Sequence, residues 1–420
     1  MTISLRKSNW KRSNLWVVRE TACASIKRPD LRAHLRGEPV KFQVNRDVFS
    51  EAVSFAVKLL PQRTTLPILS GVLIEATADG LTLSSFDYEV SARTHIAADV
   101  EEPGRVLVSG RLLAEIASRL PAAPVIFATA DSRITVRCGT ANFTLLSMPV
   151  DEYPSLPIVS NSAGVLLAED FASAISQVAV ASSRDDVTPV ITGVQLEVSE
   201  NSLSLIATDR YRVAVREIAW DAGNSGVTAA TALVPARTLV EIGKTFGHSG
   251  SVSVAITSSD ERELIAFKAE NKTVTSLLIK GNFPPVRRLF PEAVDNFAVV
   301  STAELIESVR RVSLVLEREA ALRFSFSIDG LTLEAVGSEQ AQASESIDAF
   351  LTGVDTVVSL KPQFLLDGLT AVHSEFVRIS FTKTDNPNKP GPVLITSQAS
   401  KDQPGTDNYK YLLQPNLLLR

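Results

Sequence analysis

The sequence predicts an α+β fold of three similar domains, each built from two βαβββ halves with helices on one face and antiparallel sheets on the other. The first observation behind this prediction is an internal repeat, because segment 71–91 is matched by 193–213 and again by 324–336. The spacing between the first two copies is constant at 122 residues for Gly71 and Gly193, Leu81 and Leu203, and Asp87 and Asp209. A fixed internal period of this size determines the architecture before any motif is considered.

The second observation is a pair of helical segments that recurs in the same order in each copy. Apolar residues at helical spacing predict a first helix at 48–60, 170–181 and 303–316. A second helix is predicted at 108–120, 234–246 and 360–369, where Arg111, Arg237 and Gln363 are successively 126 residues apart. Three matches in one order at nearly constant offsets indicate duplicated units.

The third observation is short alternating stretches between the helices, such as R-I-T-V-R-C at 133–138 and V-S-V-A-I-T at 252–257. This alternation is typical of strands with one buried face. Prolines near 154–157 and 290–294 interrupt regular structure and mark the boundaries. We therefore expect domains at 41–160, 161–292 and 293–420.

Residues 1–40 have a different composition from the rest. Up to Lys41 the chain carries ten Lys or Arg against three acidic residues, which leaves 32 basic and 44 acidic residues for the remainder. The segment has no apolar periodicity and its L-W-V-V run is too short for a signal peptide. We expect a basic, disordered extension, or one that is not translated, since Val40-Lys41-Phe42 resembles a natural beginning.

The composition points to a cytoplasmic globular protein, with 45% hydrophobic and 21% charged residues. No apolar run approaches the roughly 20 residues that span a bilayer, so no membrane association is expected. Cys23 and Cys138 lack partners at metal-ligand spacing. We expect neither a disulfide framework nor a bound metal.

Motifs for catalysis are missing from the sequence. The four histidines have no nucleophile motif beside them, and neither a phosphate-binding loop nor a dinucleotide fingerprint occurs. The acidic pairs Asp185-Asp186 and Glu101-Glu102 are predicted to lie at solvated turns. The sequence favours a protein without a cofactor and without catalysis, and an enzyme of unknown type remains as the alternative.

Basic residues recur on the amphipathic helical segments or just after them. Taken singly, such residues belong to solvated helix faces. If three equivalent domains turn one helical layer inward, these charges converge while acidic residues stay outside, an arrangement that suits sequence-independent contact with duplex DNA. The candidates for this channel are Arg63, Arg111, Arg119, Arg184, Arg237, Lys244 and Arg310.

Four stretches together resemble the bacterial DNA polymerase III beta subunit family, the replicative sliding clamps. They are R-T-T-L-P-I-L-S-G-V at 63–72, A-T-D-R-Y-R-V-A-V at 207–215, F-P-P-V-R-R-L-F-P at 283–291 and Y-L-L-Q-P at 411–415. The resemblance implies a DNA-clamp fold, and a head-to-tail homodimer that closes around duplex DNA and makes synthesis processive without catalysis. A β-rich repeat scaffold without a DNA role is the remaining alternative.

The resemblance also implies a pocket between the second and third domains for short linear motifs. Its partners would be the polymerase III alpha subunit, the clamp loader, repair polymerases, and ligase and mismatch-repair proteins. Carried onto matching positions, its wall comprises Ile191, Thr208, Arg210, Tyr211, Arg212, Val213, Pro284, Arg288, Leu289, Phe364, Leu412, Leu413, Gln414 and Pro415.

Three positions depart from the family pattern. Gln414 replaces a methionine in the pocket wall, Leu417 replaces an arginine, and Lys361 stands where an asparagine is frequent. These changes raise a second hypothesis, that the chain is an additional clamp copy whose pocket resists a clamp-targeting inhibitor.

Overall fold

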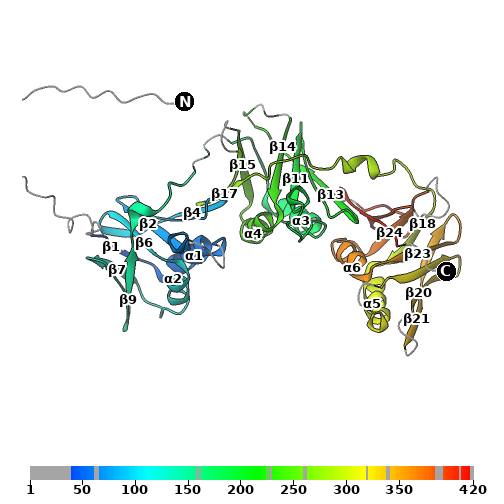
Figure 1. The fold of residues 1–420 in the computed structure, drawn as a ribbon, viewed down its shortest axis with the longest axis horizontal. Coiled ribbons are helices and arrows are strands. Elements are labelled where there is room, and N and C mark those ends of the chain that lie inside the picture. The colour runs from blue at the N-terminus through cyan, green and yellow to red at the C-terminus, as the bar shows by residue number, and fades with distance from the viewer. Residues whose placement is uncertain are drawn as a thin grey trace, which may run out of the picture.

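The computed structural model describes residues 39–60, 66–157, 159, 162–223, 225, 227, 229–258, 263–317, 320–336, 341–383, 391–405 and 408–416. Residues 1–38 of the expected extension, Arg63 and Leu417 lie outside these residues. The three repeats follow one another along an arc, and helices α1 to α6 lie on its concave side (Figure 1).

The first repeat has two helices and nine strands among its described residues. In chain order they are β1 (Lys41–Val44), α1 (Arg46–Lys58), β2 (Gly71–Thr77), β3 (Gly80–Phe86), β4 (Val90–Ile96), β5 (Asp99–Glu102), β6 (Gly104–Ser109), α2 (Gly110–Ala117), β7 (Val125–Ala130), β8 (Arg133–Cys138) and β9 (Ala141–Met148). Helix α1 begins two residues before the predicted start because the Asn45 side chain accepts hydrogen bonds from the amides of Asp47 and Val48.

The second repeat follows the same order, and the part of it that the structure describes has no counterpart of β5. It comprises β10 (Gly164–Leu167), α3 (Ala168–Ala179), β11 (Gly193–Ser199), β12 (Ser202–Thr208), β13 (Arg212–Ala219), β14 (Ala229–Pro235), α4 (Ala236–Phe246), β15 (Ser251–Ser258), β16 (Glu263–Ala269) and β17 (Lys272–Leu277).

The third repeat again has an additional short strand. It comprises β18 (Phe297–Ser301), α5 (Thr302–Val312), β19 (Leu322–Ser327), β20 (Gly330–Val336), β21 (Gln342–Ile347), β22 (Ala349–Thr352), β23 (Thr356–Leu360), α6 (Pro362–Thr370), β24 (Phe376–Phe381), β25 (Val393–Gln398) and β26 (Asn408–Leu413). Short 3-10 turns occur at Pro67–Ser70, Val150–Glu152, Pro189–Ile191, Val286–Leu289 and Ser313–Val315.

Of the three sheets in the described ranges, two cross from one repeat into the next. A 13-stranded sheet joins the first and second repeats through antiparallel pairing of β4 with β17, and a 9-stranded sheet joins the second and third through β13 and β26. The third sheet has four strands in the order β21-β20-β19-β23. The predicted α+β class with antiparallel sheets and one helical layer is confirmed.

The core lies between the sheets and the helical layer. The helices bury one stripe each, for example Phe49, Val53 and Ala56 on α1, which are fully buried. In the first repeat Phe42 stacks on Phe127 with ring centroids 4.7 Å apart. Burying a large apolar side chain of this kind stabilises the fold by about 2 kcal/mol.

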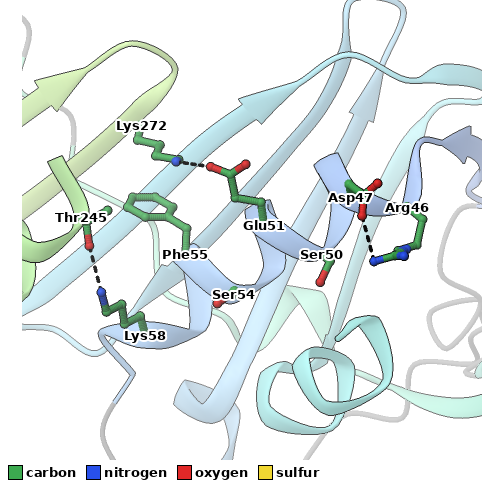
Figure 2. Close-up of a pocket in the computed structure, with 9 residues that line it drawn as sticks. All are labelled: Arg46, Asp47, Ser50, Glu51, Ser54, Phe55, Lys58, Thr245 and Lys272. Carbon is green, nitrogen blue, oxygen red and sulfur yellow. Dashed lines mark hydrogen bonds and ion pairs between the residues drawn. The ribbon is translucent and has the colours of Figure 1, made fainter. Parts of the chain in front are cut away.

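Side chains of α1 join the first and second repeats through aromatic packing and ion pairs. Phe55 of α1 lies 6.4 Å from Phe246 of α4, and the ammonium group of Lys272 contacts both Glu51 and the face of Phe55 (Figure 2). Lys58 pairs with Glu241 of α4 at 3.4 Å. The hollow at this junction, about 430 Å³, is thus lined by cations that already have carboxylate partners.

Two sequence-based expectations are wrong. Glu101 and Glu102 do not lie at a turn but in β5, a short exposed strand that pairs with β1 at the end of the sheet, where acidic side chains protect an open edge. The second wrong expectation is that acidic residues lie outside the helical layer. Glu241 lies on α4 and Glu307 lies on α5. Both occupy helix positions from which they pair with basic neighbours.

Candidate functional site

The candidate site is centred on a tight corner between β12 and β13, residues Thr208 to Arg212. One carboxylate oxygen of Asp209 accepts hydrogen bonds from the amides of Tyr211 and Arg212 at 3.0 and 3.1 Å. The Thr208 hydroxyl donates to the carbonyl of Arg212 at 2.8 Å. Arg210 therefore adopts a left-handed backbone conformation with φ 80°, which non-glycine residues rarely do.

The first repeat contains the same corner. Asp87 accepts from the amides of Glu89 and Val90 at 3.0 and 2.7 Å, and Tyr88 has φ 75°. Asp87 and Asp209, which the internal repeat aligns, therefore mark a structural corner that two repeats share. The side chains that differ between the corners are those that can carry function.

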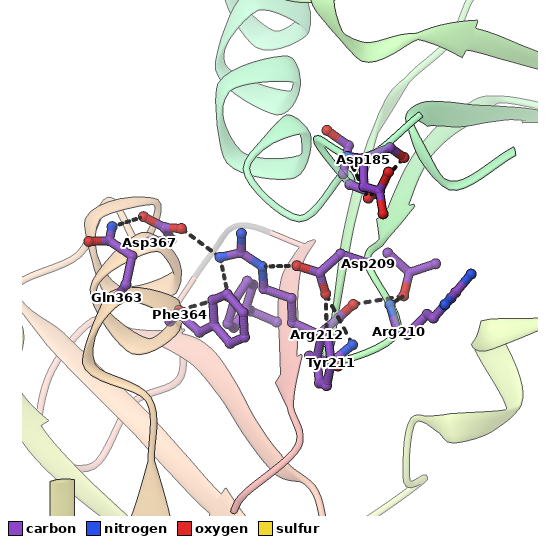
Figure 3. Close-up of polar contacts among 12 residues, drawn as sticks. Asp185, Asp209, Arg210, Tyr211, Arg212, Gln363, Phe364 and Asp367 are labelled. Atoms are coloured by element: carbon purple, nitrogen blue, oxygen red, sulfur yellow. Dashed lines mark hydrogen bonds and ion pairs between the residues drawn. The ribbon is translucent and has the colours of Figure 1, made fainter. Parts of the chain in front are cut away.

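Arg212 forms the centre of a buried network across the second junction (Figure 3). Its guanidinium group donates to Asp209 at 2.8 Å and to Asp367 of α6 at 2.6 Å, and it also donates to the Tyr411 hydroxyl at 3.2 Å. The same group lies 4.5 Å from the ring centroid of Phe364. The side chain of Arg212 is only 7% exposed, so its charge is balanced by the two carboxylates rather than by water.

The network shifts two pKa values. Burial opposes the charge on Arg212, but Tyr411, Asp367 and Asp209 outweigh it and raise the pKa of the guanidinium group. Burial raises the pKa of the Tyr411 hydroxyl despite the neighbouring cation. Tyr411 therefore stays a neutral donor, and its hydroxyl donates to the carbonyl of Phe364 at 2.7 Å.

An aromatic pair links the two repeats on the outer side of this network. Tyr211 and Phe364 stack with centroids 6.0 Å apart, and Tyr211 remains 58% exposed. The Lys361 ammonium lies 5.9 Å from the Tyr211 ring centroid and 5.6 Å from that of Phe364. The amide of Gln414 donates to the carbonyl of Tyr211 at 2.9 Å, which fixes the C-terminal segment against the corner.

A separate apolar group adjoins the corner through β13. Val213 pairs in register with Leu412, and both belong to a cluster with Val286 of the segment between the second and third repeats. Beside Val286 lie Pro284, Arg288 and Leu289, of which Leu289 is 50% exposed.

The predicted pocket residues differ in surroundings. Ile191 is buried in the 3-10 turn whose Thr188 accepts a hydrogen bond from the Arg210 guanidinium. Pro415 is buried after β26, whereas Leu413 is buried in the main core rather than in the outer apolar cluster. The sequence reasoning missed Asp367 and Tyr411, although Asp367 stands one helical turn after Phe364.

The predicted DNA-channel residues are distributed over the helical layer. Arg111 and Arg237 are exposed on α2 and α4, and Arg119 and Arg184 follow α2 and α3. Two others pair within their own helices, Lys244 with Glu241 at 2.8 Å and Arg310 with Glu307 at 2.7 Å. Within the described residues, no three His, Cys, Asp or Glu side chains lie close enough together to hold a metal ion. None of the helices in this part of the chain is long and apolar enough to cross a membrane.

The repeat, the arc of helices and the corner between β12 and β13 define a three-domain DNA clamp. Sequence models of the DNA polymerase III beta subunit match its N-terminal domain at residues 40–157, its central domain at 166–285 and its C-terminal domain at 287–402. The chain therefore belongs to the DNA polymerase III beta subunit family, the bacterial sliding clamps, and acts as a sliding clamp in DNA replication.

Individual relatives agree with this assignment. The beta sliding clamp of Streptomyces coelicolor is 44% identical over 90% of this chain and 99% of its own. A beta sliding clamp homolog of Streptomyces muensis, GriR, is 39% identical over the same shares. The crystal structure of the Bacillus subtilis clamp superposes with a TM-score of 0.82, at 26% identity over 90% of this chain and all of that one. Family membership argues against the scaffold and enzyme alternatives.

Proposed function

We propose that the protein works as a head-to-tail homodimeric ring that encircles duplex DNA in the cytoplasm and tethers the replicative polymerase. The observation that carries this proposal is that two strand edges of the described chain have no hydrogen-bonded neighbour. Within the chain, β4 pairs with β17 and β13 pairs with β26. The strands in the corresponding repeat positions, β21 and the first part of β9, have no partner on that side within the described chain.

The repeat gives the register of the missing junction. Ile96, Ile218 and Ile347 are equivalent, because each pairs with the corresponding leucine of the preceding strand. Ala92 and Ala214 lie four residues before these isoleucines, and they pair with Val274 and Tyr411 at the two junctions inside the chain. The equivalent residue of the third repeat is Ala343, which would therefore pair with Phe143 of a second copy. By the same rule, Glu345 faces Ala141 of the second copy and Gln342 faces Thr144 of the second copy.

Burial supports this pairing. Ala92, Ala214, Val274 and Tyr411 are at most 1% exposed at the two junctions inside the chain. Ala343 and Phe143 are only half-buried in the single chain, although they occupy the same positions. Pairing of the two edges would cover both side chains and satisfy the open backbone groups of each strand. A heterologous contact of this kind closes a ring when the rotation per repeat allows it.

Two experiments test the dimer: the native mass of the protein, and proline substitutions in a strand at the proposed interface and in a strand inside a sheet. Native mass spectrometry of the full chain should show about twice the 45.3 kDa of one chain. Ser344→Pro should give mainly monomer, because proline removes a ladder donor and is poorly tolerated in a paired strand. The matched control Ser325→Pro lies in β19, which is already paired on both sides, so it should unfold the repeat instead. A folded dimer of Ser344→Pro would contradict the proposed edge.

DNA contact is proposed for the concave helical layer. Arg111, Arg119, Arg184 and Arg237 would meet phosphates, with Lys244 and Arg310 reduced in effect by their own carboxylates. A contact made by charge without sequence readout can hold a duplex loosely enough to slide. The clamp should remain on circular DNA and leave linear DNA through its ends, and equal loss from both would contradict topological linkage.

Partner capture is proposed for the surface around Tyr211, Arg212 and Phe364. The apolar cluster of Val213 and Leu412 beside a few fixed donors suits short linear motifs of polymerase, clamp loader and repair proteins. No catalysis is assigned to the chain itself. Tyr211→Ala should weaken binding of a clamp-binding peptide while leaving the dimer mass unchanged.

A second candidate function is an additional clamp copy with resistance to a clamp-binding inhibitor. Gln414 and Lys361 provide the motivation, since both lie beside Tyr211 and both depart from the family pattern. A sliding clamp of Pseudomonas aeruginosa, 22% identical, has been crystallised bound to griselimycin with a TM-score of 0.80 to this chain. Calorimetry with griselimycin on this protein and on the Streptomyces coelicolor clamp decides, because equal affinities would end the resistance hypothesis.

A further inference from the structure

An acidic residue recurs at one position of the second helix in each repeat. The three residues are 126 positions apart in succession, namely Glu115, Glu241 and Asp367. In the third repeat the acid belongs to the buried network at the second junction. In the first two repeats it stands four residues after Arg111 or Arg237, the arginines proposed to meet DNA. Two acids therefore accompany the proposed DNA contacts at equivalent places.

Both glutamates lie on the side of their helix that faces away from the core. The buried residues of α4 form one stripe, and Arg237 and Glu241 lie on the opposite side of the helix. Residues four positions apart are neighbours on a helix surface. On α2 the exposed Arg111 and Glu115 have the same arrangement. Because these helices lie on the concave side of the arc (Figure 1), each carboxylate belongs to the layer proposed to meet the duplex.

Glu241 also binds two lysines. Its carboxylate oxygens lie 2.8 Å from the Lys244 ammonium and 3.4 Å from that of Lys58, which belongs to the first repeat. Figure 2 shows Lys58 extending from α1 toward Thr245 of α4, whose hydroxyl accepts a hydrogen bond from it at 3.3 Å. Burial opposes the charge on Glu241, but Lys244 and Lys58 outweigh it and lower its pKa. The glutamate and the two lysines together thus carry one positive charge instead of two.

Helix stability gives little reason for these acids. An acid that precedes a base by four residues stabilises a helix more than the reverse order, and Glu115 follows Arg111. Glu115 also lies in the last turn of α2, next to the negative end of the helix dipole. The pair of Glu241 with Lys244 has the favourable order, but exposed pairs of this kind contribute little to folding. The larger consequence of both acids is a lower positive charge on the concave layer.

We propose that Glu115 and Glu241 weaken the hold of the helical layer on duplex DNA, so that the ring slides. This inference rests on the proposed DNA contact and adds the residues that limit its strength. A cation that is already paired with a carboxylate gains less from a phosphate, and the carboxylate itself repels the phosphate. Without these acids the arginines and lysines beside them would bind the backbone more tightly, and movement along the duplex would be slower.

The test measures binding of a short fluorescein-labelled duplex to the full-length protein by fluorescence anisotropy over a range of salt concentrations. A short duplex enters a closed ring by its end, so no clamp loader is required. Glu115→Gln and Glu241→Gln keep the length and the helix propensity of the side chain and remove its charge. At low salt the double variant should bind roughly fivefold tighter than the wild type.

The salt dependence gives a second readout. A plot of the logarithm of the association constant against the logarithm of salt concentration should be steeper by about 1–2 in the double variant, as expected for one or two additional phosphate contacts. Of the single variants, Glu241→Gln should have the larger effect, because it releases Lys58 and Lys244.

Glu197→Gln is the matched control. Glu197 pairs with Arg287 at 2.7 Å, and the adjacent Leu196 and Val198 of β11 are buried in the core beneath the helices. Because side chains alternate along a strand, Glu197 lies on the face of the sheet away from the helical layer. This substitution alters the net charge as much as either test variant, so it should leave the affinity and the salt dependence unchanged.

The outcomes separate the inference from the DNA contact on which it rests. A double variant that binds like the wild type or like Glu197→Gln overturns the inference, and so does tighter binding with an unchanged salt dependence. Arg237→Gln should weaken binding. If it binds like the wild type, or if the wild type does not bind the duplex, the proposed DNA contact is wrong as well. Tighter and more salt-dependent binding of the double variant, together with weaker binding of Arg237→Gln, supports the proposal.

Discussion

Replacing Asp367 by asparagine tests whether two carboxylates share the buried guanidinium group of Arg212. The substitution keeps the shape of the side chain and removes its charge. Arg212 is 7% exposed, Asp209 12% and Asp367 22%, so the interaction is only weakly screened by water. A hydrogen bond to a charged partner contributes about 1.5–3 kcal/mol. We expect Asp367→Asn to lower the free energy of unfolding by about 1.5 kcal/mol, because Arg212 keeps Asp209.

The second step is the double variant with Asp209→Asn. An asparagine at 209 can still accept the hydrogen bonds of Tyr211 and Arg212 amides, so the corner should persist. The double variant leaves Arg212 without any carboxylate, and an uncompensated buried charge costs about 3–5 kcal/mol. The total loss should therefore exceed the sum of the single losses by about 1 kcal/mol.

Trp220 provides the readout. It is 4% exposed in the second repeat and is the one tryptophan in the part of the chain that the structure describes. Urea unfolding would be followed by its fluorescence in a full chain with Trp10 and Trp16 changed to phenylalanine. Glu334→Gln is the control, because Glu334 forms an exposed pair with Arg323 at 3.7 Å worth at most about 1 kcal/mol. Additive losses in the double variant, within about 0.4 kcal/mol, would refute the shared network.

Three further predictions concern other parts of the molecule. Asn45→Ala should lower stability by about 1 kcal/mol through the lost cap of α1, and an unchanged urea midpoint would exclude that role. The hydrogen bond from Arg311 holds the pKa of Glu345 below its ordinary 4.5, so this contact should be complete above that pH and be lost as pH falls below it. An NMR titration of the Glu345 carboxyl with an ordinary midpoint would contradict the contact. Charge reversal of Arg111 and Arg237 should shorten retention on circular DNA in a salt-dependent way, and retention equal to wild type would remove both from the channel.

Much of the fold could be predicted from the internal repeat alone. The offsets predicted the order of helices and strands, and the 122-residue spacing aligned Asp87 with Asp209. Strands β5 and β22 were not predicted, because each is only four residues long and β5 reads Asp-Val-Glu-Glu. A short, charged edge strand carries the composition of a turn, and pairing decides its conformation.

The site could be predicted only in part from the sequence, because its interacting residues lie far apart in the chain. Arg212 and Asp367 are 155 residues apart, and their contact exists because β13 and β26 join two repeats in one sheet. Asp367 also stands at a position where the preceding repeat has another acid, Glu241, so comparison of the repeats gives no signal there. Glu241 instead pairs with Lys58 and Lys244, the first of them in the neighbouring repeat.

The two junctions inside the chain show how one scaffold supports different chemistry. At the first junction the corner carries Glu89 and Val90, and α4 has Thr238 at the place of Phe364. Neither an aromatic stack nor a buried guanidinium group can form from these residues. At the second junction Tyr211, Arg212 and Phe364 occupy the same backbone positions and create an exposed ring beside a fixed cation. Because the corner backbone is the same in both, the capacity to hold a partner depends on side chains that the fold itself does not require, and this explains why disagreement between the repeats, rather than their similarity, marks the candidate site.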